Sequence, residues 1–174
     1  MPIRLKACVP VLTLCGYAFA QPVVQDYPDS LPPGPAAPAA IAAAALSGWH
    51  ATASPADDSV TLRDTAGAPL RTLERARLAA LVPWMSLDSG GDGPHALAFS
   101  DSGRLLFIML RDASPALDGQ GSDAILRYDT QTDQLTLFRR YELTPAGTIT
   151  APAALAHFEG KLYVGLPGSI AILR

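Results

Sequence analysis

The sequence has few cysteines, few charged residues and no strongly basic stretch, and each shortage excludes a class of protein. Of the 174 residues only two are cysteines, Cys8 and Cys15, and both lie in the first twenty positions. The 13 lysines and arginines are outnumbered by 16 acidic residues, which gives a net charge of -3. Because no basic stripe is available to contact a phosphate backbone, we predict no nucleic-acid partner. The hydrophobic content of 49% is sufficient for one buried core.

Several catalytic motifs are also missing. The sequence contains no Gly-x-Ser-x-Gly turn for a nucleophilic serine and no glycine-rich loop that would hold a phosphate. The three histidines, His50, His95 and His157, are too far apart for a zinc motif such as H-E-x-x-H. The sequence therefore names no reaction.

Residues 1–20 have the pattern of a secretory signal peptide. Arg4 and Lys6 precede an apolar run over residues 7–17, and residues 18–20 supply the small-x-small pattern that a signal peptidase recognises. We therefore expect cleavage before Gln21 and a periplasmic or secreted protein. No apolar run reaches the roughly 20 residues that span a bilayer, so we expect no membrane span.

Both cysteines belong to this expected leader. Its loss would leave a chain without cysteine, and hence without disulfides, thiolate metal sites or cysteine catalysis. Two alternatives stay open, a buried helix and a lipid anchor at Cys15. Leu14 argues against the anchor, because a small residue normally precedes a lipidated cysteine.

Residues 21–47 are rich in proline and alanine and include Pro32-Pro33-Gly34-Pro35. This composition favours an extended, solvated backbone, so we expect a linker. Within it, residues 38–46 are compatible with one short helix, with Pro38 at its start and Gly48 just beyond its end.

Two sequence phrases each occur twice after Gly48. The first reads as strand, tight turn and strand over residues 96–108 and again over residues 153–164, with Gly103 and Gly160 at the turns. The second covers residues 59–73 and 124–138 and contains a polar turn opened by Asp-Thr. A third copy of the second phrase begins at Ser169 and stops at Arg174.

Two hairpins in series form a four-stranded antiparallel sheet, and such sheets repeated radially are the blades of a β-propeller. We therefore predict an all-β, propeller-like domain over residues 48–174, with a β-sandwich as the alternative. Blades take about 40 to 50 residues and closed rings about four or more blades. The range thus predicts an incomplete arc of two to three blades, in which the hairpin at 60–73 lacks an inner pair. Its open edges would serve a protein partner or self-association, unless the reading frame is truncated.

Residues 93–107 resemble the inner hairpin of bacterial propellers of the YVTN, NHL and gluconolactonase-like kind, or of phytase-like esterases. Residues 125–130 resemble the outer hairpin of the same propellers. The resemblance implies blade architecture. It implies no particular activity, because these families include lactonases, phytase-like esterases and binding scaffolds.

The blade topology predicts that the loops at residues 83–94 and 111–123 share one face, where ligands bind on such scaffolds. These loops carry acidic candidates for a calcium (Ca²⁺) site, which requires oxygen ligands: Asp88, Asp92, Asp112, Asp118 and Asp123. Ordinary loop polarity is the alternative. His95 lies at the rim as a candidate acid or base. We predict packing roles for Trp84 and His157 and a short helix over residues 74–82.

Two functions follow from these observations. The first is an exported propeller module that acts as a binding or scaffold domain. The alternative is a periplasmic hydrolase of the lactonase or phytase-like esterase type, with Asp92 and Asp112 as metal ligands and His95 as acid or base.

Overall fold

The computed structural model describes residues 40–44, 46–54, 56–85, 87, 93–111, 122–142, 152, 154–166 and 169–174. The chain divides into two units, Met1–Pro32 and Pro33–Arg174, and every described residue belongs to the second. The expected leader therefore lies outside the described residues. In the described part, no helix has the length and apolar character needed to cross a membrane.

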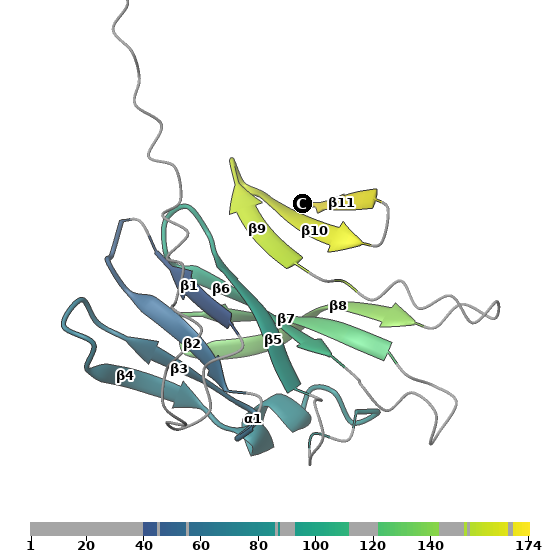
Figure 1. The fold of residues 1–174 in the computed structure, drawn as a ribbon, viewed down its shortest axis with the longest axis horizontal. Coiled ribbons are helices and arrows are strands. Elements are labelled where there is room, and N and C mark those ends of the chain that lie inside the picture. The colour runs from purple at the N-terminus through teal and green to yellow at the C-terminus, as the bar shows by residue number, and fades with distance from the viewer. Residues whose placement is uncertain are drawn as a thin grey trace, which may run out of the picture. The chain divides into compact units, whose positions relative to one another are not determined.

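The described residues form three antiparallel sheets with their strands in chain order (Figure 1). The first sheet contains β1 (Ala40–Ala43), β2 (His50–Ser54), β3 (Ser59–Arg63) and β4 (Pro69–Leu73). The second contains β5 (Gly93–Phe99), β6 (Leu105–Arg111), β7 (Ser122–Asp129) and β8 (Gln134–Glu142). The third contains β9 (Ala154–Phe158), β10 (Lys161–Leu166) and β11 (Ser169–Leu173). The chain thus has the predicted all-β, propeller-like architecture of successive four-stranded blades, the last with three strands.

The central strands of the second sheet, β6 and β7, bury side chains on both faces, because successive side chains point to opposite sides and each side packs in a core. In β6, Leu106 and Ile108 belong to the core shared with the first sheet, whereas Phe107 and Met109 belong to the core shared with the third. This explains why β6 is an unbroken apolar run, whereas β2 and β3 alternate buried and half-buried residues. The second sheet therefore joins the two cores.

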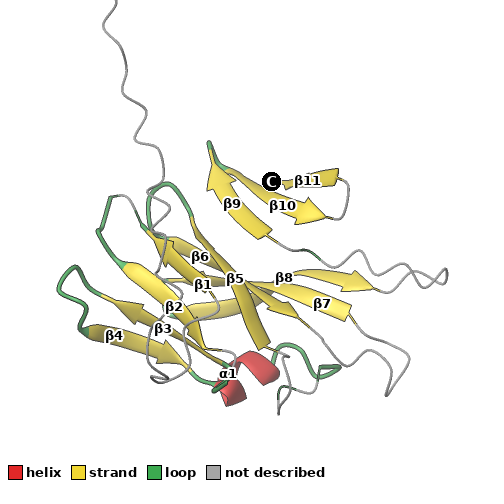
Figure 2. Ribbon diagram, viewed as in Figure 1, coloured by secondary structure: helices red, strands yellow, loops and turns green. Residues whose placement is uncertain are grey.

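The predicted turns and the short helix are confirmed. Gly103 and Gly160 have φ of 71° and 72°, the left-handed conformation that their tight turns require. Helix α1 (Arg75–Ala79), shown in red in Figure 2, lies within the expected range. Leu78 and Val82 bury their side chains in the first core, which holds this segment against the sheets.

Asp133, in the turn between β7 and β8, links the second sheet to the first. Its carboxylate forms ion pairs with Arg71 of β4 and with Arg77 of α1, and it accepts a hydrogen bond from the Tyr128 hydroxyl at 3.0 Å. The hydrogen bonds from Arg71 and Arg77 lower the pKa of Asp133 to about 2. Residues from three elements therefore meet at one turn.

The helix expected over residues 38–46 is wrong. Ala40–Ala43 form β1, which pairs with β2 from Ala40 opposite Ala53 to Ala43 opposite His50. Alanine favours a helix locally, but pairing with β2 and packing against β5 decide the conformation here. The hairpin at 60–73 consequently does have an inner pair before it, and the sheet begins inside the range expected as a linker.

Candidate functional site

The strand ends that flank the two predicted site loops lie at one end of the second sheet. Gly93, at the start of β5, is opposite Arg111, at the end of β6, and Leu110 is opposite Ala124 of β7. Four predicted metal ligands lie outside the described residues: Asp88, Asp92, Asp112 and Asp118. The fifth, Asp123, is opposite Tyr141 and is buried, with 5% of its surface exposed.

His95 lies in β5 at a register shift between Pro94 and Ala96, and its side chain is half-buried. Within the described ranges, no three histidine, cysteine, aspartate or glutamate side chains gather as they would around a metal ion. The described residues therefore bring neither His95 nor Asp123 into a metal-binding group.

A buried carboxylate that the sequence analysis missed, Asp58, lies next to Gly93. Asp58 is 2% exposed, and its Oδ2 is 2.9 Å from Nε of Arg75. A Cβ atom added to Gly93 would overlap Oδ1 of Asp58. Nothing in the local sequence distinguishes Asp58 from its neighbour Asp57, because its burial depends on the packing of β5 against the first sheet.

The other end of the second sheet carries a cleft of about 610 Å³. We had predicted the site at the opposite end, on the loops at residues 83–94 and 111–123. The cleft is lined by the β5–β6 turn, by β7 and β8, and by residues of the β9–β10 hairpin. Most of the residues that line it have polar side chains, with both signs of charge: Ser100, Asp101, Ser102, Arg104, Leu105, Arg127, Asp129, Gln134, Thr136, His157 and Gly160.

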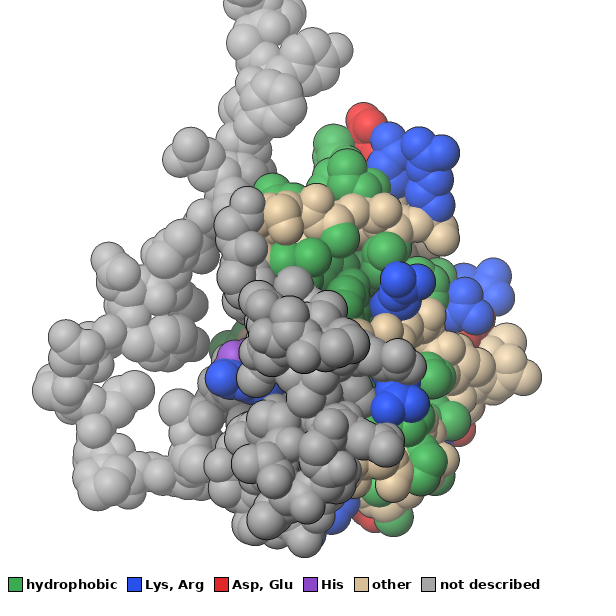
Figure 3. Space-filling model, turned by 90° about the vertical axis from the view of Figure 1, so that its right-hand side faces the viewer, with side chains coloured by type: hydrophobic (Ala, Val, Ile, Leu, Met, Phe, Trp, Pro, Cys, Tyr) green, Lys and Arg blue, Asp and Glu red, His purple; other side chains and the backbone are tan. Residues whose placement is uncertain are grey.

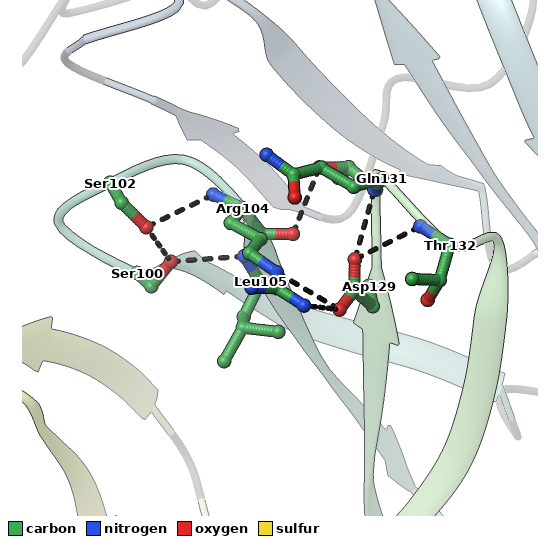
Figure 4. Close-up of polar contacts among 8 residues, drawn as sticks. Ser100, Ser102, Arg104, Leu105, Asp129, Gln131 and Thr132 are labelled. Atoms are coloured by element: carbon green, nitrogen blue, oxygen red, sulfur yellow. Dashed lines mark hydrogen bonds and ion pairs between the residues drawn. The ribbon is translucent and has the colours of Figure 1, made fainter.

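An ion pair between Arg104 and Asp129 joins two turns at this cleft (Figure 4). Nε and Nη2 of Arg104 donate to Oδ2 of Asp129 at 3.0 and 2.8 Å. The backbone N–H groups of Gln131 and Thr132 donate to Oδ1 of Asp129 at 2.9 and 3.1 Å. The hydrogen bond from Arg104, with smaller help from the backbone donors, lowers the pKa of Asp129 to about 2.

The β5–β6 turn is also held by serine hydroxyls (Figure 4). Oγ of Ser100 accepts a hydrogen bond from the Leu105 backbone at 3.0 Å, and Oγ of Ser102 accepts one from the Arg104 backbone at 3.3 Å. The two hydroxyls lie 3.2 Å apart. The polar groups of this turn therefore fix its shape.

Asp101 connects this turn to the third sheet. Its Oδ1 is 3.1 Å from Nδ1 of His157, and its Oδ2 accepts a hydrogen bond from the Gly160 backbone at 3.3 Å. The hydrogen bond from His157 lowers the pKa of Asp101 below its ordinary value. The His157 ring also stacks on Phe107, with centroids 5.7 Å apart. His157 thus has the packing role predicted for it, and its contacts connect the third sheet to the second.

The low pKa of Asp129 makes the stability of the chain depend on pH. The folded-state pKa is below the ordinary 3.8, so its contacts contribute stability that is present above about pH 3.8 and is lost as the pH falls through about 2. We expect Asp129→Asn to lower Tm at about pH 5, and we expect this difference in Tm to be largely lost at about pH 2. Circular dichroism melting at both pH values measures it, with Asp57→Asn as an exposed control. A difference that persists unchanged at low pH would contradict the assignment.

Trp84 has the predicted packing role. Its side chain packs against the first core, and the Arg140 guanidinium lies 4.3 Å from the centre of its ring. This distance is within the range of a cation–π contact. The contact ties β8 to the segment that follows α1.

A second candidate surface is the outer face of the third sheet, which we define as the side turned away from the second sheet. The register places Tyr163 opposite Ala156 and Ile172, Gly165 opposite Ala154 and Ile170, and Lys161 opposite Phe158. Directly opposite residues share a face, so these side chains lie on one side. The exposed fractions are 60% for Phe158, 69% for Ile170 and 55% for Ile172. Figure 3 shows, on one side of the molecule, hydrophobic side chains reaching the surface between lysine and arginine side chains.

No family model and no curated protein sequence matches the chain. Among solved structures, the chain is similar to hydrazine synthase of Kuenenia stuttgartiensis, with 14% identity, a TM-score of 0.48 and coverage of 91% of this chain and 36% of that one. It is similar to virginiamycin B lyase of Staphylococcus aureus, with 13% identity, a TM-score of 0.45 and coverage of 77% and 36%. It is also similar to a Lactobacillus plantarum protein, with 21% identity, a TM-score of 0.43 and coverage of 77% and 40%.

The chain thus spans 36% to 40% of the length of these structures. We infer no activity from similarities of this extent. The order and pairing of the strands in the three sheets carry the conclusion that the chain is built of propeller-like blades.

Proposed function

We propose that the chain is an exported β-propeller module that acts as a binding or scaffold domain, with the outer face of the third sheet as its interaction surface. The exposed row of apolar side chains on that face, with Phe158, Ile170 and Ile172 each more than half exposed, carries the proposal. Contiguous apolar surface of this kind is typical of sites where proteins bind other proteins.

The first sheet provides a comparison, because its side away from the core is also exposed. On the first sheet, the side turned away from the core presents Ile41, which is 52% exposed, and then Thr52, Thr61 and Thr72 in one row across the four strands. The hydroxyls of Thr61 and Thr72 lie 3.4 Å apart. Water solvates the three threonines well, whereas covering the aliphatic and aromatic side chains of the third sheet with a partner lowers the free energy.

Export is the second part of the proposal. It is supported by the basic start, the apolar run and the small residues at 18 and 20, which together give residues 1–20 the pattern of a signal peptide. Cleavage before Gln21 would place a chain without cysteine in the periplasm or outside the cell.

The hydrolase alternative depends on Asp92 and Asp112, which lie outside the described residues. Within the described residues, the closest polar contacts at the cleft join side chains to one another, as in the pairs Arg104–Asp129 and Asp101–His157. These pairs engage charged side chains of the cleft in holding turns and sheets together. We therefore place binding before hydrolysis.

The proposal predicts selective cross-linking of the outer face. A photoreactive amino acid replaces Phe158 in one variant and Leu70, which is 47% exposed on the first sheet, in the control. On irradiation in the producing organism, we expect one discrete heavier species from position 158 and none from position 70. Mass spectrometry identifies the partner and shows whether the chain begins at Gln21. Equal labelling at both positions, or a retained leader in the exported fraction, would contradict the proposal. Turnover of lactones or esters by the purified chain, with or without Ca²⁺, would favour the alternative.

A further inference from the structure

The cleft at the turn end of the second sheet is large enough to hold a small molecule. Its volume of about 610 Å³ lies within the roughly 300–1,000 Å³ that is typical of ligand pockets. Arg127 of β7 lines the cleft and lies opposite Phe107 of β6 and Thr136 of β8. Directly opposite residues share a face, and Phe107 packs in the core shared with the third sheet. Arg127 therefore lies on the face of the second sheet that is turned toward the third.

The two carboxylates of the cleft lining, Asp101 and Asp129, are occupied by donors of the chain itself. Oδ2 of Asp129 accepts hydrogen bonds from Arg104, and its Oδ1 accepts hydrogen bonds from two backbone N–H groups. Oδ1 of Asp101 contacts Nδ1 of His157, and its Oδ2 accepts a hydrogen bond from a backbone N–H group. Every oxygen of both carboxylates therefore has a partner within the chain.

Arg127 is the cation of the cleft that has no such partner. Within the described ranges, its guanidinium forms no ion pair and no hydrogen bond, and it lies over the ring of Phe138, 6.0 Å from the ring centre. Phe138 follows Thr136 by two residues in β8, so it lies on the same face. The ring holds one side of the guanidinium, and the five N–H donors remain available. The cleft thus presents a fork of donors whose geometry suits an anion.

The neighbouring side chains of the lining are uncharged and can both donate and accept hydrogen bonds: Ser100, Ser102, Gln134 and Thr136. Such groups suit the hydroxyls of a polar ligand. We propose that the cleft binds a small hydroxylated molecule that carries a carboxylate or a phosphate group, and that the Arg127 guanidinium binds the anionic group. The inference does not depend on the proposed function, because it uses the cleft and leaves the outer face of the third sheet free.

Isothermal titration calorimetry of the full chain tests the binding. The probes are glucuronate, which carries a carboxylate, glucose 6-phosphate, which carries a phosphate, and glucose, which is neutral. We expect at least one acidic probe to bind with a Kd of about 1 mM or below, and glucose to bind at least about tenfold more weakly. If neither acidic probe binds up to about 10 mM, or if glucose binds as well as they do, the inference is overturned.

The variant Arg127→Gln tests the assigned residue. We expect it to weaken binding of the acidic probe at least about tenfold, because it removes both the charge and the forked donors. Arg139→Gln is the matched control, since the Arg139 guanidinium also lies 6.0 Å from the centre of an aromatic ring, that of Tyr141, but Arg139 does not line the cleft. The control is expected to bind as the unchanged chain does. Equal weakening in both variants, with folding of each confirmed by circular dichroism, would show a general charge effect and overturn the inference.

The variant Arg127→Lys distinguishes the two anionic groups. It keeps the charge but loses the planar fork, so we expect it to weaken binding of glucuronate more than binding of glucose 6-phosphate. Nuclear magnetic resonance locates the bound anion: the Nε–H signal of Arg127, identified by its loss in Arg127→Gln, is expected to shift with the acidic probe and to stay in place with glucose. A signal that stays in place while calorimetry detects binding would put the anion elsewhere and overturn the assignment.

Discussion

Replacing Leu126 by alanine is expected to lower the free energy of unfolding by about 2–5 kcal/mol. Leu126 lies in β7, has no exposed surface, and belongs to the core between the first and second sheets with Leu106 and Ile108. Alanine removes apolar atoms that contact both sheets and leaves a cavity, because the strands on either side are fixed by their neighbours. Denaturant unfolding followed by circular dichroism measures the loss.

Leu70→Ala is the matched control for this substitution. Leu70 lies in edge strand β4 with 47% of its surface exposed, so alanine there removes the same atoms without opening a cavity. We expect its effect to stay within about 0.5 kcal/mol. Similar losses in the two variants would show that the core between the first two sheets does not exist as described.

Replacing Gly93 by alanine is expected to cost about 2–4 kcal/mol, for two reasons that add. Gly93 has φ of 113°, a conformation that residues with a Cβ rarely adopt. Its new Cβ would also overlap Oδ1 of Asp58, a buried carboxylate that Arg75 holds in place. Moving Asp58 aside would disturb that ion pair, and separating a buried carboxylate from its partner is costly. Thermal and denaturant unfolding of the variant measure the sum.

Gly67→Ala separates the two reasons. Gly67 also has a positive φ, of 84°, but a Cβ added there would meet no atom within 4 Å. Its substitution carries only the backbone cost, about 1–2 kcal/mol. The excess loss in Gly93→Ala then measures the conflict with Asp58. If both glycine variants lose the same stability, Asp58 has room to move and the contact is not restrictive.

The parts of the fold that were predictable are those with strong local signals. The hairpins around Gly103 and Gly160 combine a positive-φ glycine with alternating apolar residues, and both formed as predicted. β1 and β2 gave no such signal, because Ala40–Ala43 and His50–Ser54 contain small residues whose burial comes from pairing and from contact with β5. Tertiary contacts decided these segments, and propensity pointed the other way.

The cleft was missed for a related reason. Two of its polar contacts, Arg104–Asp129 and Asp101–His157, each join residues that are far apart in sequence. No spacing rule brings such residues together. A signal was present in the repeated hairpin phrase, since stacking two copies brings the turns after Phe99 and Phe158 to the same end. We instead predicted the site on the longer loops at the opposite end.

The double burial of the second sheet has a consequence for how this chain can vary over evolutionary time. Leu106 and Ile108 belong to one core and Phe107 and Met109 to the other, so none of these four side chains can be replaced by a polar one without disturbing a core. A single blade of this kind cannot be an independent folding unit, because one of its two apolar faces always needs a neighbour. Any blade that is gained or lost beside the second sheet must therefore leave both apolar faces of this sheet covered by a neighbour.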